Sequence, residues 1–260
     1  MFSKKKIYSG LLTIFMILFA CTIANWPLHA FKESKDYMLS SSHPIATQVG
    51  EKILKEGGNA IDSAIATQMT LNVVEPQSSG IGGGGFLLYY DKKKQRIDVY
   101  DGREVAPENA KKDLFLKTDG KPLSHQEAIL GGKSVGVPGL LAMLSLAHKD
   151  HGMRSLKDLF QPAIDLSKNG FPISPRLSKQ IADDTLLRKT KTAKIFFYNQ
   201  DGSPKKAGDI VYNINFSETL KSITSNGIED FYQGKIAKRM VEKISKSNIN
   251  PGKMKLSDLR

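Results

Sequence analysis

The stretch Gly80-Ile-Gly-Gly-Gly-Gly-Phe-Leu-Leu-Tyr-Tyr90 sets the order of the elements around it. Its glycines break regular structure, and the apolar run that follows is typical of a strand. After the turn Asp91-Lys-Lys-Lys94, a second run, Arg96-Ile-Asp-Val-Tyr100, alternates as a strand does. The two runs predict a β-hairpin that the chain enters through a glycine loop.

A helical hairpin is predicted before this loop. Residues 45–56 carry apolar side chains at helical spacing, and Gly57-Gly58 ends that pattern as glycine commonly does at a helix C-terminus. Asn59 can cap a second helix, whose apolar side runs from Ala60 to Val73.

Gly80, Gly82 and Gly85 satisfy the pattern G-x-G-x-x-G. A dinucleotide site needs a strand before these glycines and a helix after them. Here a helix precedes and a strand follows, so we exclude a nucleotide site. The glycines permit close approach of the backbone and positive φ angles near a packed sheet or a ligand.

The rest of the chain is predicted to be mostly helical, with one short strand at Ser134–Val137. No internal repeat and no clear linker divides it. The predicted helices cover residues 139–148, 153–167, 177–187, 216–225 and 237–245.

The first 30 residues are typical of an export signal. Lys4, Lys5 and Lys6 precede an uncharged apolar run, and Leu28-His29-Ala30 offers a cleavage point. Retention of residues 7–26 as a membrane anchor and lipidation at Cys21 stay open as alternatives. We expect an exported protein, periplasmic or secreted, that meets a membrane only through this segment. Residues 31–44 are interpreted as a polar lead-in.

The composition is that of a globular chain, with 40% hydrophobic and 25% charged residues among 260. The net charge is +12, but three of the 38 basic residues lie in the signal and the others are spread widely. No RNA-binding aromatic motif and no Cys/His finger accompanies the charge, so we exclude a nucleic-acid partner.

No metal or other cofactor is expected. The single cysteine, Cys21, excludes a disulfide within the chain and a multi-cysteine metal site. His148 and His151 share a helix face, but they stand at a helix C-terminus, where histidine is favourable against the dipole.

Arg103 is the candidate binding residue, in the segment Asp101-Gly-Arg-Glu-Val-Ala-Pro107 just after the second strand. A guanidinium there can hold a small carboxylate through paired hydrogen bonds. From the residues alone, a solvated arginine paired with Asp101 or Glu104 stays open as the alternative.

Several segments taken in order resemble the N-terminal part of gamma-glutamyltranspeptidases. The resemblance covers about residue 43 to the end of the chain, and its most specific parts are the N-A-x-D pattern, the G-x-G-G-G-G-F loop and R-E-x-A-P. The segments are 46–64, 80–86, 101–107, 136–139, 161–164 and 230–234.

This resemblance implies an α+β fold of the N-terminal-nucleophile type, an αββα sandwich in a precursor that cleaves itself into two subunits. Its new N-terminal threonine attacks the γ-glutamyl amide of glutathione or a similar compound, and water or an amine resolves the acyl-enzyme. By its position in R-E-x-A-P, Arg103 matches the family arginine that binds the α-carboxylate of the γ-glutamyl group.

The segment T-T-H-[YF]-x-V that holds the family's threonine is absent, so the nucleophile is expected beyond Arg260. Residues 45–260 are therefore predicted to be a partial large-subunit domain, lacking the small-subunit half and inactive alone. The alternatives are a silent γ-glutamyl-binding module and one half of a split enzyme with a separately encoded C-terminal part. Relatives that act on acylated β-lactams or on poly-γ-glutamate also stay open.

Overall fold

Helices α2 (Pro44–Lys55) and α3 (Ala60–Val74) form the helical hairpin predicted from the sequence. The computed structural model describes residues 36–260. Pro44 occupies the first turn of α2, and Gly57 follows the helix with a φ of 87° that suits glycine. Asn59 and Asp62 form a reciprocal capping box at the start of α3.

The second half of the chain is mostly helical, as predicted, although several of its helices are short. The elements after α3 are β1 (Phe86–Asp91), β2 (Arg96–Asp101), α4 (His125–Ala128), α5 (Leu140–His151), α6 (Leu156–Asn169), β3 (Phe171–Pro172), α7 (Pro175–Asp183), η1 (Leu187–Lys189), α8 (Lys191–Phe197), β4 (Ile210–Val211), α9 (Ile214–Asn226), α10 (Glu229–Tyr232), α11 (Lys235–Ser245) and η2 (Leu256–Leu259).

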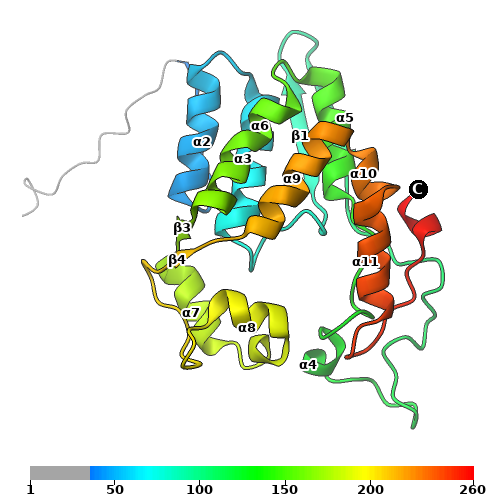
Figure 1. The fold of residues 1–260 in the computed structure, drawn as a ribbon. Coiled ribbons are helices and arrows are strands. Elements are labelled where there is room, and N and C mark those ends of the chain that lie inside the picture. Colours follow the sequence, from blue (N-terminus) through cyan, green and yellow to red (C-terminus); the bar gives the residue numbers. More distant parts are fainter. Residues whose placement is uncertain (1–35) are drawn as a thin grey trace, which may run out of the picture. The chain divides into compact units, whose positions relative to one another are not determined.

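Four helices pack in succession to form the body of the unit from Leu39 to Arg260. Helix α3 lies between α2 and α6, and α6 packs in turn on α9 (Figure 1). Ile65 and Met69 of α3 and Leu220 of α9 are completely buried in one continuous core. A smaller cluster holds α11 to the C-terminal segment through Ala237, Ile244, Met254 and Leu259.

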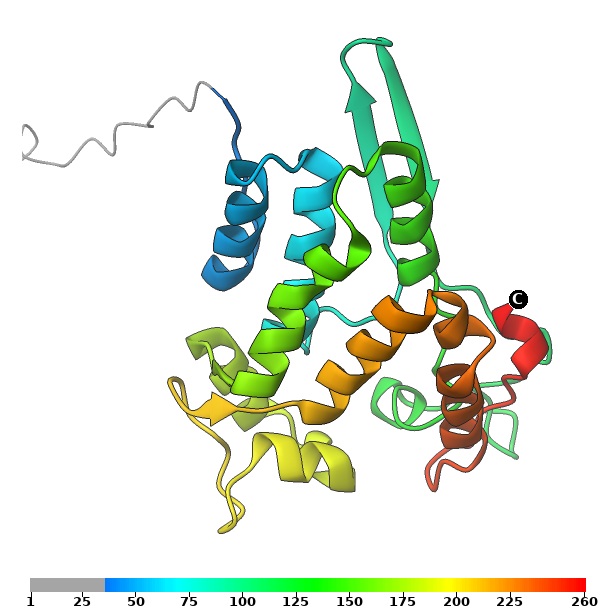
Figure 2. The same cartoon turned by 45° about the horizontal axis from the view of Figure 1, so that its top comes forward.

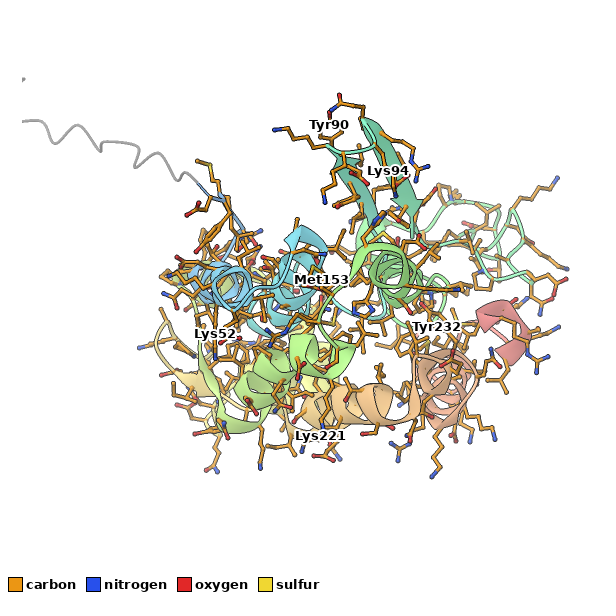
Figure 3. All side chains as sticks on the ribbon, turned by 90° about the horizontal axis from the view of Figure 1, so that it is seen from above. Lys52, Tyr90, Lys94, Met153, Lys221 and Tyr232 are labelled. Atoms are coloured by element: carbon orange, nitrogen blue, oxygen red, sulfur yellow. The ribbon has the colours of Figure 1, made fainter. Side chains whose placement is uncertain are left out.

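The β1–β2 hairpin packs on α5 with one face only. The strands pair antiparallel, with Leu87 opposite Tyr100 and Leu88 opposite Val99. Tyr100 is buried and Leu87 and Tyr89 are partly buried against the core. Figure 2 shows the hairpin beside α5 and projecting past it, and Figure 3 shows Tyr90 and Lys94 near its outer end.

The strand predicted at Ser134–Val137 is wrong. Only Val137 forms a bridge, to Val105, because the residues before it coil back on themselves. The Ser134 hydroxyl donates to the carbonyl of Ile129, and the amide of Val135 donates to the carbonyl of Gly132.

The predicted helices differ from the observed ones by up to four residues at their ends, and two of these differences have a clear local cause. The helix expected from Met153 begins at Leu156, because the amides of Met153 and Arg154 donate to the Asp62 carboxylate and Ser155 is the cap. The helix expected to reach Leu187 ends at Asp183. The next residue, Asp184, accepts hydrogen bonds from later amides and starts a turn.

Among residues 36–260, no helix is long and apolar enough to cross a membrane. The predicted signal or anchor, including residues 7–26 and Cys21, lies outside the described residues.

Candidate functional site

The glycine loop, residues 80–85, lies between α3 and β1, so the predicted order of helix, glycines and strand is confirmed. Of the two properties that these glycines permit, the structure uses close approach of the backbone, and none of residues 80–85 adopts a positive φ. Glycine is needed at Gly84 because the loop backbone packs closely on a neighbouring segment: a Cβ on Gly84 would lie 2.3 Å from the carbonyl oxygen of Gly102. Gly80 and Gly82 have open space where a Cβ would be.

Three chain segments meet at glycines around this loop. Gly85 and Gly102 exchange backbone hydrogen bonds of 3.1 and 2.9 Å, which extend the β-hairpin by one pair. A Cβ on Gly139 would lie 2.3 Å from the carbonyl oxygen of Gly102, so these two backbones also touch. Side chains larger than hydrogen would separate the segments.

Hydrogen bonds fasten the same three segments together. The carbonyl of Gly83 accepts from the amides of Gly139 and Leu140, both at 3.1 Å, at the start of α5. The amide of Val137 donates to the carbonyl of Val105 at 2.8 Å. The backbone that carries Arg103 is therefore held on both sides, by the glycine loop and by the segment before α5.

Arg103 stands on this backbone with its side chain 68% exposed. Its amide donates to Asp101 Oδ1 at 2.9 Å, and its Nη1 lies 3.3 Å from Glu104 Oε2. Both acidic partners considered from the sequence are therefore used, one by the main chain and one by the side chain. Most of the guanidinium still faces outward, where it can donate to an added anion.

The Glu104 side chain is partly buried and lies between Arg103 and the junction of the three segments. Its Oε2 is buried and, within the described part of the chain, accepts no hydrogen bond; its contact is the ion pair with Arg103. A Cβ on Gly84 would lie 2.7 Å from this oxygen. Glu104 therefore fixes the position of the guanidinium from the protein side.

A hollow of 340 Å³ adjoins Arg103. Lys133 brings a second cation to its wall and makes no ion pair with any residue in the range 36–260. Pro107, Leu114 and Phe115 contribute apolar wall. Two cations beside a partly apolar hollow suit a small molecule with a carboxylate at one end.

The segment around Asn59 and Asp62 has a structural role. The fully buried Asp62 carboxylate accepts from the amides of Asn59, Met153 and Arg154, at 3.0 to 3.2 Å. It joins the turn between α2 and α3 to the turn before α6. Three amide donors satisfy the buried charge without a cation.

His148 and His151 serve separate contacts. His148 Nε2 lies 2.6 Å from the carbonyl of Arg154, whereas His151 Nε2 lies 3.1 Å from Asp98 Oδ2 in the hairpin. The described residues contain no group of three or more metal-ligating side chains. These histidines hold the end of α5 to its neighbours.

The sequence alone missed the buried Oε2 of Glu104 and the place of Lys133 beside the same hollow as Arg103. Glu104 directly follows Arg103, but only the close packing around Gly84 shows that one of its carboxylate oxygens is buried. Lys133 lies 30 positions along the chain in an irregular segment, and no local pattern brings it to Arg103.

Comparison with known proteins identifies relatives for nearly all of this unit. The family profile of Gamma-glutamyltranspeptidase matches residues 46–260. The Glutathione hydrolase proenzyme of Bacillus subtilis is 43% identical over 211 residues, which are 81% of this chain and 36% of that protein. The Capsule biosynthesis protein CapD proenzyme of Bacillus anthracis is 32% identical, over 82% of this chain and 36% of that protein.

A solved structure supports the same likeness. The crystal structure of Helicobacter pylori gamma-glutamyltranspeptidase superposes with a TM-score of 0.81 at 33% identity, over 88% of this chain and 64% of that chain. The predicted fold class, an incomplete αββα sandwich of the N-terminal-nucleophile type, is confirmed. This chain spans about a third of the length of the curated relatives it matches.

Proposed function

This chain belongs to the gamma-glutamyltranspeptidase family, and we propose that it forms the N-terminal part of a glutathione hydrolase or transferase. The assembled enzyme cleaves a γ-glutamyl amide and passes the acyl group to water or an amine. The observation that carries the proposal is Arg103, outward-facing beside the glycine loop and the 340 Å³ hollow.

In this proposal Arg103 binds the α-carboxylate of the γ-glutamyl group. The ion pair with Glu104 on one side leaves outward N–H groups for a second carboxylate. Lys133 adds positive charge to the same hollow. The carboxylate would then fix one end of the substrate and present the amide to the nucleophile.

The nucleophile is proposed to come from a C-terminal part, either on the same precursor or separately encoded. The relatives named as proenzymes are about three times as long as the matched region. A threonine whose own α-amino group serves as base would attack the amide carbon and form an acyl-enzyme. Residues 36–260 would then bind substrate but not turn it over alone.

The outer face of the β1–β2 hairpin supports this need for a second part. Five large apolar side chains share that face, and each is 55 to 70% exposed. A patch of this kind is typical of a surface that another element covers. The five are Phe86, Leu88, Tyr90, Ile97 and Val99. We propose that the C-terminal part covers them, and that the signal in residues 1–30 exports the chain before assembly.

The function can be tested with a joined protein, a chimera in which this chain replaces the matched N-terminal region of the Bacillus subtilis relative. Release of a chromogenic amine from a γ-glutamyl amide is measured. We expect turnover, with kcat/KM about 10- to 100-fold lower in Arg103→Ala, because one charged hydrogen-bonded contact is worth about 1.5–3 kcal/mol.

Two comparisons make the result specific. Arg103→Lys keeps the charge but loses the paired geometry, so it should recover only part of the loss. Arg239→Ala, an exposed arginine on α11, should change nothing. Turnover by the joined protein that is equal for wild type and Arg103→Ala would remove the binding role from Arg103, and absent turnover would contradict the function.

A further inference from the structure

The turn that leads into the glycine loop is fastened by a buried carboxylate. Glu75 caps the C-terminus of α3 and is 2% exposed. Its carbonyl accepts from the amides of Ser78 and Ser79, at 2.9 and 3.0 Å, and its Oε2 accepts from Gln77 Nε2 at 2.8 Å. Residues 75–79, just before the loop, are thus folded around Glu75, through its main-chain carbonyl and its carboxylate.

Arg176 supplies the cation for this carboxylate from a distant part of the sequence. It stands in the first turn of α7, and its Nη1 donates to Glu75 Oε2 at 2.6 Å. Its Nη2 donates to Ser78 Oγ at 3.2 Å. One guanidinium therefore bridges both ends of the turn through two nitrogens held in a fixed plane, a geometry that a lysine ammonium does not reproduce.

Arg176 is the one cation within ion-pair distance of Glu75 in residues 36–260. His43 is also near. Burial lowers the pKa of His43, and the Glu75 carboxylate offsets only part of that lowering. A buried carboxylate left without its cation is costly, and the structure around it rearranges. Removing Arg176 would therefore disturb the turn around Glu75 first, since Arg176 itself is half exposed.

A short path of contacts joins this turn to Arg103. Gly80 follows the turn directly, and its carbonyl accepts from the amide of Gly83 at 3.0 Å. The next residue, Gly84, touches the carbonyl of Gly102 and the Glu104 side chain. A shift of the turn would therefore move the backbone on either side of Arg103 and the carboxylate that orients it.

We propose that Arg176 is a positioning residue for γ-glutamyl recognition: by fastening the turn at Glu75 it holds the glycine loop against Gly102 and Glu104 and so sets the placement of Arg103. This inference rests on the proposed function for its catalytic consequence. Its structural consequence stands on the contacts alone.

Hydrogen exchange of this chain tests the structural consequence. The amides of Ser79, Gly83 and Gly85 are all hydrogen-bonded, and we expect each to exchange at least tenfold faster in Arg176→Met. The amides of α9 should not change. Lys179→Met, one turn along α7 and paired only with exposed Asp183, is the matched control and should leave all of these rates unchanged.

A second variant distinguishes the loss of the Glu75–Arg176 ion pair from a general loss of stability. In Glu75→Gln/Arg176→Met no buried charge remains in this turn, so exchange in the loop should be slower than in Arg176→Met alone. Equal exchange rates in Arg176→Met and wild type, or faster exchange in the double variant than in Arg176→Met, would contradict the claim that Arg176 fastens the turn at Glu75.

The joined enzyme tests the catalytic consequence. Arg176→Met should raise KM for the γ-glutamyl amide about tenfold while kcat stays within threefold, and Arg176→Lys should lie between. A KM equal to that of wild type would overturn the positioning role. If the wild-type joined enzyme is inactive, the proposed function fails. The exchange rates still test whether Arg176 fastens the turn at Glu75.

Discussion

Helix α3 and the β1–β2 hairpin are both rich in apolar residues, but within residues 36–260 only α3 buries its apolar side chains on all sides. Ile61, Ile65 and Met69 are at most 2% exposed, between α2 and α6. Leu88 and Val99 on the outer face of the hairpin are 70% and 64% exposed. Helix α3 is thus covered by its neighbours, whereas the hairpin has one covered face and one open face.

This difference separates two roles. The helical body supplies a rigid support, and Asp62 and Glu75 fasten its turns through buried hydrogen bonds. The open face and the outward-facing Arg103 lie on the segment from Phe86 to Gly102 and just beyond it. Substitutions on the open face should therefore affect assembly more than the stability of this chain.

The largest expected effect on the free energy of unfolding comes from comparing a buried residue of α3 with an exposed residue of the hairpin. Ile65→Ala should lower the free energy of unfolding by about 2–5 kcal/mol, because it opens a cavity in a closed core. Leu88→Ala removes a similar side chain from the open face and should change it by no more than about 0.5 kcal/mol. Denaturant unfolding of the purified chain measures both, and equal losses would mean that the hairpin face is covered in the isolated chain.

A smaller loss is expected at the junction between the α2–α3 turn and the turn before α6. Asp62→Ala leaves three amides without their acceptor and should cost about 2–3 kcal/mol. Asp62→Asn keeps one side-chain oxygen and should cost less. The same unfolding assay checks the order, and an unchanged midpoint for Asp62→Ala would contradict the role given to this carboxylate.

The glycine loop offers a matched pair of substitutions. Gly84→Ala places a methyl group 2.3 Å from the Gly102 carbonyl oxygen and should destabilise the chain by about 1–3 kcal/mol. Gly82→Ala meets open space and should be nearly neutral. Similar midpoints for the two variants would mean that the contact with Gly102 does not constrain the loop.

The covered face of the hairpin should show an effect only in alkaline solution. Burial, followed by the hydrogen bond to Asp150, raises the pKa of Tyr100 to about 12. Because the unfolded side chain titrates near 10, its contribution to stability is present below pH 10 and is lost as pH rises to about 12. Wild type should therefore lose more stability than Tyr100→Phe over that interval, in unfolding curves measured at each pH.

Local patterns predicted the parts of the fold that depend on neighbours in sequence. The Asn59 cap, the Gly57-Gly58 turn and the alternation in Arg96–Tyr100 placed the helical hairpin and the β-hairpin to within a few residues. The strand predicted at Ser134–Val137 failed because short-range hydrogen bonds of Ser134 and Val135 coil that segment. Helices of four to seven residues, such as α4, α8 and α10, carry too little periodicity to predict.

The candidate site was predicted only in part for a related reason. Arg103 follows the hairpin closely in sequence, so its nearness to the glycine loop could be inferred. Lys133 reaches the hollow beside Arg103, and Arg176 reaches the turn before the glycine loop, from 30 and 73 positions further along the chain than Arg103, and tertiary packing alone places them there. Long-range contacts of this kind leave no local signal.

Binding of a C-terminal part to the open face is the most direct test of the account. The full chain is titrated with the remaining C-terminal part of the Bacillus subtilis relative, produced separately, and complex formation is measured by analytical ultracentrifugation. Ile195→Asp is the control, because Ile195 is 72% exposed on α8, away from the hairpin.

We predict that the wild-type chain and Ile195→Asp form the complex equally well, and that Leu88→Asp weakens it at least tenfold without changing the stability of the chain alone. Equal binding by all three proteins, or no complex with any of them, would contradict the claim that this chain is the N-terminal part of an assembled γ-glutamyl-transferring enzyme.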